Sequence, residues 1–285
     1  MPGIVILVAV AMAAFAANSV FARLALGAAE IDAAGYTAVR LLSGAMTLAA
    51  LLLLQGRSLD VISAFRKRGR WSTAAALFGY AIAFSYAYLL LGAGMGALIL
   101  FATVQVSMLG WALLKGDRPG PVALAGMAVA LGAFAYLVSP GLVAPHPLGT
   151  ALMIGAGISW AVYSLLGRGS KEPLVDTAYN FLLTVPAALV LAAFSLAQGG
   201  PSFIGLVWAI ASGALASGIG YAIWYRALPL LSRTSAAIVQ LTVPVIATAG
   251  GTLLIGEQLT WRLAIASALI LGGVAVAIIA RRKAP

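Results

Sequence analysis

Ten long apolar stretches constrain the fold of this 285-residue chain more than any other feature. Each contains about 20 residues, the length that an α-helix needs to cross the hydrocarbon core of a bilayer. The stretches are residues 4–26, 33–54, 71–91, 94–114, 121–138, 149–167, 175–197, 203–227, 230–254 and 261–280. Charged residues make up only 8% of the chain, against about a quarter in soluble domains. The sequence therefore predicts an all-α integral membrane protein with ten transmembrane helices.

The basic residues predict how these helices are oriented. With a cytoplasmic N-terminus, the even-numbered connections and the C-terminus are also cytoplasmic, and they hold 14 of the 17 Lys and Arg residues. These are Arg57, Arg66, Lys67, Arg68, Arg70, Lys115, Arg118, Arg168, Lys171, Arg226, Arg233, Arg281, Arg282 and Lys283. Cytoplasmic loops of membrane proteins are enriched in Lys and Arg. The net charge of +10 thus indicates membrane topology and not a nucleic-acid partner.

Four short motifs recur in the same order about 140 residues apart. Residues 19–21 resemble 161–163, 79–82 match 220–223, 103–106 match 242–245, and 114–117 match 254–257, at offsets between 139 and 142. We predict a first repeat at 1–140, a linker at 141–148 and a second repeat at 149–285. Each repeat holds five helices, so the second enters the membrane upside down. Inverted repeats are typical of secondary transporters, whose binding site lies near the membrane midplane.

Several motifs resemble the EamA family of the drug/metabolite transporter superfamily, over essentially the whole chain. They are residues 18–23, 36–42, 155–163 and the stretch from Tyr225 to Thr260, which includes Pro244 and Gly256-Glu257. The resemblance implies ten helices in two inverted five-helix repeats, a bacterial inner membrane, and export of amino acids and related metabolites. The Trp160 and Tyr221 motifs add a narrower resemblance to YddG-type amino-acid exporters. The first repeat departs from the family pattern, with Gln105 where the second has Pro244.

The chain offers little material for catalysis or metal binding. It has no cysteine and one histidine, His146, so we expect no metal site and no cofactor. All seven acidic residues fall in connections or at helix ends. An intramembrane enzyme would need paired aspartates, a serine with a base, or a metal cluster at membrane depth. We therefore expect no catalytic residues and no enzymatic activity. Intramembrane carboxylates normally mark proton or sodium coupling, so downhill export fits this sequence better than proton coupling.

The middle of the membrane is instead supplied with neutral polar and aromatic side chains. The candidate substrate-binding residues are Asn18, Tyr80, Phe84, Phe101, Gln105, Trp160, Tyr163, Tyr221, Trp224 and Gln240. Amides and hydroxyls would bind the ammonium and carboxylate of a zwitterion, and the rings would cover its apolar part. At each position the competing interpretation is ordinary helix packing. Helices 121–138 and 261–280 carry small residues at four-residue spacing, so we expect a peripheral structural role or a weak dimer contact.

Arg40 is a candidate contact for a substrate carboxylate, since it lies about 10 Å along its helix at 1.5 Å per residue. Snorkelling, or pairing with Glu30 or Asp32, is the alternative. The sequence as a whole predicts an alternating-access exporter of amino acids or similar small neutral or zwitterionic metabolites. Export of hydrophobic drugs or other metabolites with proton coupling is the second hypothesis, and a channel or passive scaffold is the third. The expected partners are lipid and a small-molecule substrate, in a monomer or weak dimer with cytoplasmic termini.

Overall fold

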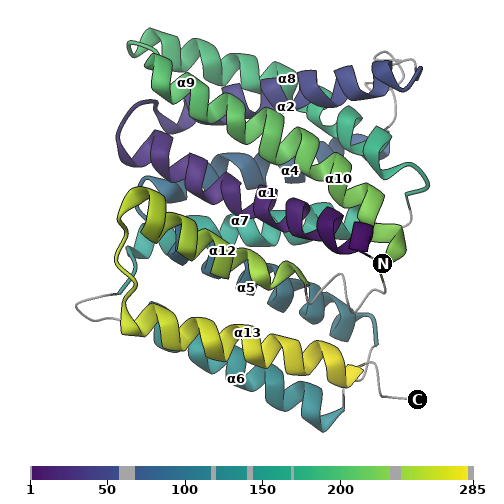
Figure 1. Ribbon diagram of the computed structural model, residues 1–285, viewed down its shortest axis with the longest axis vertical. Helices are drawn as coiled ribbons and strands as arrows, with labels where there is room; N and C mark the ends of the chain where they lie inside the picture. Colours follow the sequence, from purple (N-terminus) through teal and green to yellow (C-terminus); the bar gives the residue numbers. More distant parts are fainter. Residues whose placement is uncertain are drawn as a thin grey trace.

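A computed structural model of the chain describes residues 2–57, 68–116, 120–139, 144–167, 170–231 and 239–281. Its helices are α1 (Pro2–Gly27), α2 (Ala33–Leu54), α4 (Arg68–Tyr88), α5 (Ala93–Leu114), α6 (Pro121–Val138), α7 (Pro147–Leu166), α8 (Pro173–Ala197), α9 (Phe203–Ile210), α10 (Gly220–Ala227), α12 (Thr242–Gly250) and α13 (Trp261–Arg281). The short segments η1 (Ala211–Ile219), η2 (Leu228–Leu230) and η3 (Gly251–Ile255) continue the helices before them. Because α9, η1, α10 and η2 are continuous, the described residues form ten helical rods that lie side by side (Figure 1).

The ten rods confirm the predicted all-α membrane fold of two inverted five-helix repeats. Within the described residues, seven rods are long and apolar enough to cross a membrane. The shorter apolar rods α6 and α12–η3, and the 21-residue α4, complete the set. Most bounds agree with the predicted stretches to within about three residues. The prediction for 230–254 differs most, since residues 232–238 lie outside the described part and α12 begins only at Thr242.

Helix ends are fixed by the residue types that cap helices. Asp32 accepts a hydrogen bond from the Gly35 N–H at 2.9 Å and starts α2. Ser202 does the same for α9 through the Gly205 N–H at 3.0 Å. The sole histidine, His146, caps α7 and precedes a proline at the first helical position. Each cap satisfies a backbone donor that would otherwise lack a partner at the start of a helix.

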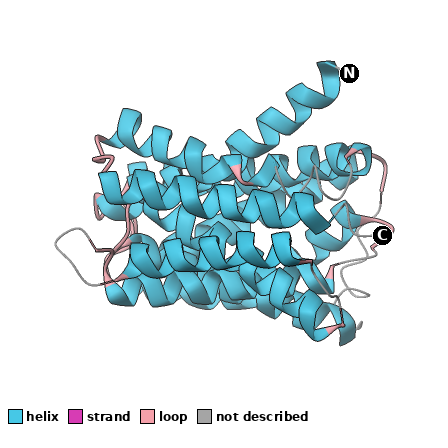
Figure 2. Cartoon of the chain, turned by 90° about the horizontal axis from the view of Figure 1, so that it is seen from below, coloured by secondary structure: helices cyan, strands magenta, loops and turns pink. Residues whose placement is uncertain are grey.

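The lateral surface of the bundle is apolar. Large hydrophobic side chains in the middle of helices point outward, for example Met46 at 73% exposed and Val190 at 69%. Water would oppose such a surface, whereas lipid tails accept it. Successive rods run in opposite directions, so α1 begins and α13 ends at the same end of the bundle (Figures 1 and 2). The first turns of α1 project beyond the other helices (Figure 2). The cytoplasmic placement of this end stays a prediction.

Contacts between the two sets of five rods follow a symmetric pattern. The pairs α2–α8, α5–α12 and α6–α13 each join corresponding members of the two sets. The contact of α2 with η1 has its counterpart in α4 with α8, and that of α1 with α12 in α5 with α7. In each case a contact made by a helix of one set is repeated by the corresponding helix of the other set. A two-fold relation between repeats produces this pattern. The repeat boundaries at 1–140 and 149–285 stay predictions.

The α6–α13 pair lies at one edge of the bundle, at the bottom of Figure 1. A Cβ atom on Gly126 would lie 2.6 Å from the Gly273 carbonyl oxygen, so the two backbones touch there. The residue of α13 that makes this contact is Gly273, and its neighbour Gly272 takes no part, because a Cβ on Gly272 would meet nothing within 4 Å. Arg262 fastens the same pair, since its Nη2 donates to the Ser139 hydroxyl at 2.7 Å just beyond α6.

We expect Gly126→Ala to lower the melting temperature of the purified protein in detergent, because the added methyl meets backbone atoms that cannot move aside. Overpacking of this kind costs about 1–3 kcal/mol. The matched control is Gly132→Ala on the same helix, where a Cβ would meet nothing within 4 Å. That control should keep or slightly raise the melting temperature, since alanine favours helix more than glycine does. Equal melting temperatures for the two variants would contradict this packing.

Candidate functional site

A cavity lies inside the bundle, between rods of both sets. The space between the atoms of its wall is about 440 Å³, a figure that includes open solvent at the mouth and not only the enclosed part of the cavity. The lining residues are Phe15, Asn18 and Ser19 of α1, Tyr80 and Phe84 of α4, Leu100, Phe101 and Val104 of α5, Trp160 of α7, Tyr221 of α10, and Gln240. Aromatic rings and neutral polar groups predominate, and no acidic side chain among the described residues lines the cavity. The composition is that of a small-molecule site.

The structure brings seven of the ten predicted residues together at this cavity. They are Asn18, Tyr80, Phe84, Phe101, Trp160, Tyr221 and Gln240. Gln105, Tyr163 and Trp224 do not line it. Gln105 follows the lining residue Val104 on α5 but is itself not part of the wall, while Tyr163 stacks behind Trp160 with ring centroids 5.3 Å apart. Trp224 is buried and contacts Phe15 at 5.8 Å. A role in substrate binding stays a prediction for all ten.

The cavity also includes residues that sequence reasoning did not select. Phe15, Leu100 and Val104 are apolar, so nothing in their type distinguishes them from the rest of their helices. Their periodicity could have found two of them. Leu100 and Val104 are four residues apart and share one face of α5 with each other. Phe15 is three residues before the candidate Asn18 on α1, so Asn18 already marked the face on which Phe15 lies.

Trp160 is the centre of the aromatic wall. Its ring centroid lies 4.8 Å from that of Tyr80 and 5.7 Å from that of Tyr221. Tyr221 in turn meets Phe15 edge to face at 5.6 Å. Offset and edge-on ring pairs of this kind hold one another in place. The four rings come from α7, α4, α10 and α1, so helices of both repeats position the same wall.

A buried polar cluster stands behind Asn18. The Asn18 Oδ1 accepts hydrogen bonds from the Ser212 hydroxyl at 2.8 Å and the Ser217 hydroxyl at 3.4 Å. The two serines are five residues apart, yet they share a face because η1 is a π-helix with i→i+5 hydrogen bonds. With its oxygen occupied in this way, Asn18 keeps its amide N–H groups as donors toward the cavity.

Arg40 lies within the bundle and is 2% exposed. Its Nη2 donates to the Tyr80 hydroxyl at 3.0 Å and its Nε to the Ser217 hydroxyl at 3.4 Å. The guanidinium carbon lies 4.6 Å from the Phe84 ring centroid and 5.1 Å from that of Tyr80. Two rings of the cavity wall therefore stand between the charge of Arg40 and the cavity.

The predicted alternatives for Arg40 do not hold. Glu30 accepts from the Ser202 hydroxyl at 2.5 Å, and Asp32 accepts from Gly35 and Ser195, so neither acid pairs with Arg40. The side chain does not snorkel to the bundle end either, since it is buried. Among the described residues, the ion pairs are Arg23–Glu257 and Arg57–Glu172. Arg40 is in neither, and its Nη1 is buried with no hydrogen-bond partner.

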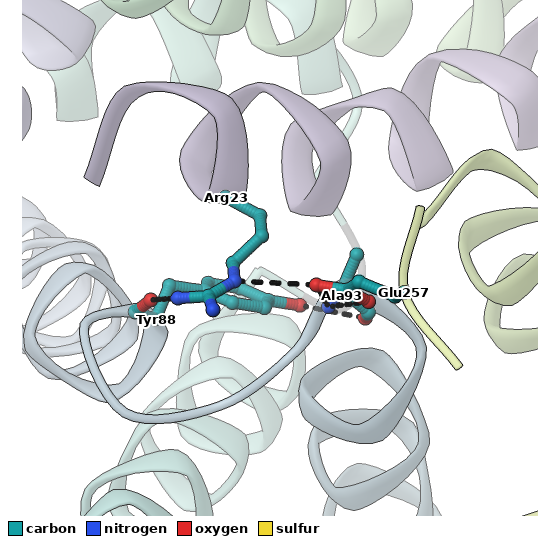
Figure 3. Close-up of polar contacts among 4 residues, drawn as sticks. All are labelled: Arg23, Tyr88, Ala93 and Glu257. Carbon is teal, nitrogen blue, oxygen red and sulfur yellow. Dashed lines mark hydrogen bonds and ion pairs between the residues drawn. The ribbon is translucent and has the colours of Figure 1, made fainter. Parts of the chain in front are cut away.

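A second polar cluster lies toward the end of the bundle where α1 ends. It joins three segments of the chain (Figure 3). Both carboxylate oxygens of Glu257 accept from the Ala93 N–H, at 2.8 and 3.0 Å. Arg23 donates through Nε to Glu257 at 3.2 Å and through Nη1 to the Tyr88 carbonyl oxygen at 3.2 Å. Sequence reasoning placed Glu257 in a connection and gave it no role.

The chain is similar to several known proteins. The sequence model described as the EamA-like transporter family matches residues 147–279. A protein of Pseudomonas aeruginosa is 50% identical over 272 residues, which are 95% of this chain and 93% of that one. An Archaeoglobus fulgidus protein named "Uncharacterized transporter" is 28% identical, over 70% of this chain and 72% of its own.

Two further matches concern a named function and a fold. An Escherichia coli protein named "Probable amino-acid metabolite efflux pump" is 25% identical over 221 residues, covering 69% of this chain and 74% of that protein. A crystal structure matches with a TM-score of 0.66 and 22% identity, over 96% of this chain and 99% of that chain. At this identity the structural match supports the fold alone.

The absence of cysteine in the sequence makes the cavity testable by labelling. We expect Val104→Cys, which lines the cavity, to react several-fold faster with a small membrane-permeant thiol reagent than Ala102→Cys does. Both positions lie on α5 and both are 4% exposed, so burial alone predicts equal rates. The measurement is the labelled fraction against time in proteoliposomes. Equal rates would contradict a cavity that small solutes can enter.

Proposed function

The chain belongs to the EamA-like transporter family, and from that membership we propose that it exports amino acids or similar small neutral or zwitterionic metabolites. The family makes it a multi-pass membrane transporter and not an enzyme. The single observation that supports this cargo is the cavity wall, which combines aromatic faces with amide and hydroxyl groups. The name of the Escherichia coli relative, "Probable amino-acid metabolite efflux pump", points the same way.

A zwitterion with an apolar side chain suits this wall. Tyr80, Ser19 and Asn18 offer hydroxyl and amide donors in the cavity wall. Trp160, Phe101 and Tyr221 offer ring faces, which bury apolar groups and attract an ammonium through cation–π interaction. A channel would need a continuous polar path, whereas the wall of this cavity consists largely of aromatic rings. These features support carrier transport over passive permeation.

The cavity also supports export that is driven by the substrate's own gradient. A proton-coupled transporter usually carries a carboxylate at membrane depth. Within the described residues, acids sit in connections or first turns, such as Glu172 and Asp176 at the start of α8. The second hypothesis, proton-coupled export of hydrophobic drugs, has no corresponding group in the cavity wall. Alternating access between the two repeats is the proposed mechanism, with the cavity exposed to each side in turn.

The test is counterflow in proteoliposomes with a panel of labelled amino acids, with and without an imposed pH gradient. We expect saturable counterflow for amino acids with aromatic or branched apolar side chains, at a rate that the pH gradient leaves unchanged. No counterflow with any amino acid would overturn the proposed cargo. Uptake that accumulates only with the gradient would favour the proton-coupled alternative.

Replacing Trp160 with alanine should raise the half-saturating concentration of a transported aromatic amino acid about tenfold, because burying a large apolar side chain against a ring contributes about 1.5 kcal/mol or more. The matched control is Trp111→Ala on α5, since Trp111 is 44% exposed on the outside of the bundle. Counterflow kinetics on equal amounts of inserted protein give the comparison. A similar rise in both variants would show that Trp160 acts through the fold and not through the substrate.

A further inference from the structure

The charge of Arg40 is the feature of the cavity region that the proposed function does not explain. A guanidinium carries five N–H donors, and burying its charge without a neighbouring acid is costly. A charge that is nevertheless buried in a membrane protein often marks a functional site. Within the described residues Arg40 meets hydroxyls and ring faces but no carboxylate, and its Nη1 has no partner at all. The site therefore holds one uncompensated positive charge next to the cavity.

Tyr80 connects that charge to the cavity. Its hydroxyl oxygen accepts from Arg40, so its own proton is left to donate, and the described residues give it no acceptor. A hydroxyl that accepts from a cation becomes a stronger donor, because hydrogen bonds in a chain polarise one another. Tyr80 also lines the cavity, where Asn18 presents its amide N–H groups. A group bound here would meet donors backed by a positive charge.

We infer that the transported substrate carries a carboxylate, which the Tyr80 hydroxyl binds under the charge of Arg40. The inference deepens the proposed function and rests on it, because it concerns the same cavity. It also changes the expected role of Arg40. The guanidinium lies behind the rings of Tyr80 and Phe84, so it acts through Tyr80 as a positioning residue. Organic cations without an acid group are excluded, since they would add to the uncompensated charge.

The test uses three probes on the full chain in detergent, with affinities taken from ligand-induced shifts of the melting temperature. The probes are 3-phenylpropionate, with a carboxylate only, L-phenylalanine, with both groups, and L-phenylalaninamide, with an ammonium only. We expect the two carboxylates to bind at least about tenfold more tightly than the amide, as for a charge-assisted hydrogen bond. Tyr80→Phe should remove most of that preference while keeping the ring.

Tyr36→Phe is the matched control. Tyr36 is a buried tyrosine one turn before Arg40, outside the cavity wall, so its loss should leave the preference unchanged. The inference is overturned if the amide binds as tightly as the carboxylates, if no carboxylate binds, or if Tyr80→Phe weakens all three probes equally. Binding of 3-phenylpropionate without L-phenylalanine would overturn amino-acid export and leave the carboxylate inference standing.

A separate observation concerns the polar cluster of Arg23, Tyr88, Ala93 and Glu257, which we name the end cluster (Figure 3). It ties α1 and the α4–α5 turn to the segment after η3, so it joins the two sets of helices. Glu257 caps the first turn of α5, where a carboxylate is favoured by the helix dipole. Gly92 and Gly251 leave room for it, since a Cβ on either would lie within 3 Å of its Oε2 atom.

The end cluster lies beyond the cavity on the same helices. Arg23 is five residues past Asn18 on α1, and Ala93 is seven residues before Leu100 on α5, so the cavity begins about 7–10 Å further in. Arg23 and Glu257 are 28% and 22% exposed, which lets water reach both charges if they separate. Polar contacts also join the ends of α2 and α8. Arg57 pairs with Glu172 at one end of these two helices, and Ser195 donates to Asp32 at the other.

We propose that the end cluster is a latch that closes one exit of the cavity and opens during transport. In the orientation predicted from basic residues, this exit faces outward. The reporter is Val104→Cys in proteoliposomes, labelled with a membrane-impermeant thiol reagent. Glu257→Gln in that background should raise the labelling rate several-fold, because the uncharged amide loses the ion pair and weakens the cap on α5.

Glu172→Gln is the control, since it breaks the exposed ion pair at the other end of the bundle. It should leave the labelling rate unchanged. A double variant that swaps the charges, Arg23→Glu with Glu257→Arg, should label as fast as Glu257→Gln, because an arginine cannot cap α5. The latch is overturned if Glu257→Gln leaves the rate unchanged, if Glu172→Gln raises it equally, or if the swap restores slow labelling.

Discussion

The absence of water from the bilayer core is the constraint on which the rest of this structure depends. Every backbone N–H and C=O at membrane depth must find its partner inside the protein, and a helix provides all of them within one segment. The outward side chains can then be apolar, as Met46 and Val190 are. The same constraint makes each buried polar side chain informative, because it needs a partner from another helix or from a ligand. Asn18, Ser212 and Ser217 partner one another, whereas Arg40 Nη1 has no partner among the described residues.

The cavity and the close helix contacts beside it depend on where small residues allow two helices to approach each other. A Cβ on Gly213 would lie 2.2 Å from the Arg40 carbonyl oxygen, so η1 rests directly on α2. This contact brings Ser217 to Arg40 and Ser212 to Asn18. Where the facing residues are large, as with Trp160 and Tyr221, the helices stand further apart and the rings line the cavity between them. Close approach on one side and aromatic spacing on the other thus shape one site.

Sequence reasoning predicted the helices well and the site only in part, for physical reasons. Span length is a direct consequence of bilayer thickness, so the stretch at 33–54 coincides with α2. Seven cavity residues were found because polar and aromatic types are rare enough at membrane depth to stand out. Val104 could not be found by type, and Tyr163 was selected although it lies behind Trp160. Ser212 and Ser217 were missed because a regular helix would turn them roughly 140° apart, and only the π-helical η1 aligns them.

The charged groups of the cavity region and of the end cluster differ in whether a neighbouring charge neutralises them. This difference fits two different roles in transport. Arg23 and Glu257 neutralise one another at a partly exposed position, so parting them leaves two hydrated charges and no buried one. Arg40 differs, because it is buried and its neighbours are hydroxyls and ring faces, which do not neutralise its charge. A substrate carboxylate near Tyr80 would supply the missing charge only while it is bound. Occupied and empty cavities would then differ in net charge, whereas the end cluster stays neutral whether joined or parted. A carrier needs both kinds of contact, one that responds to cargo and one that separates at little cost.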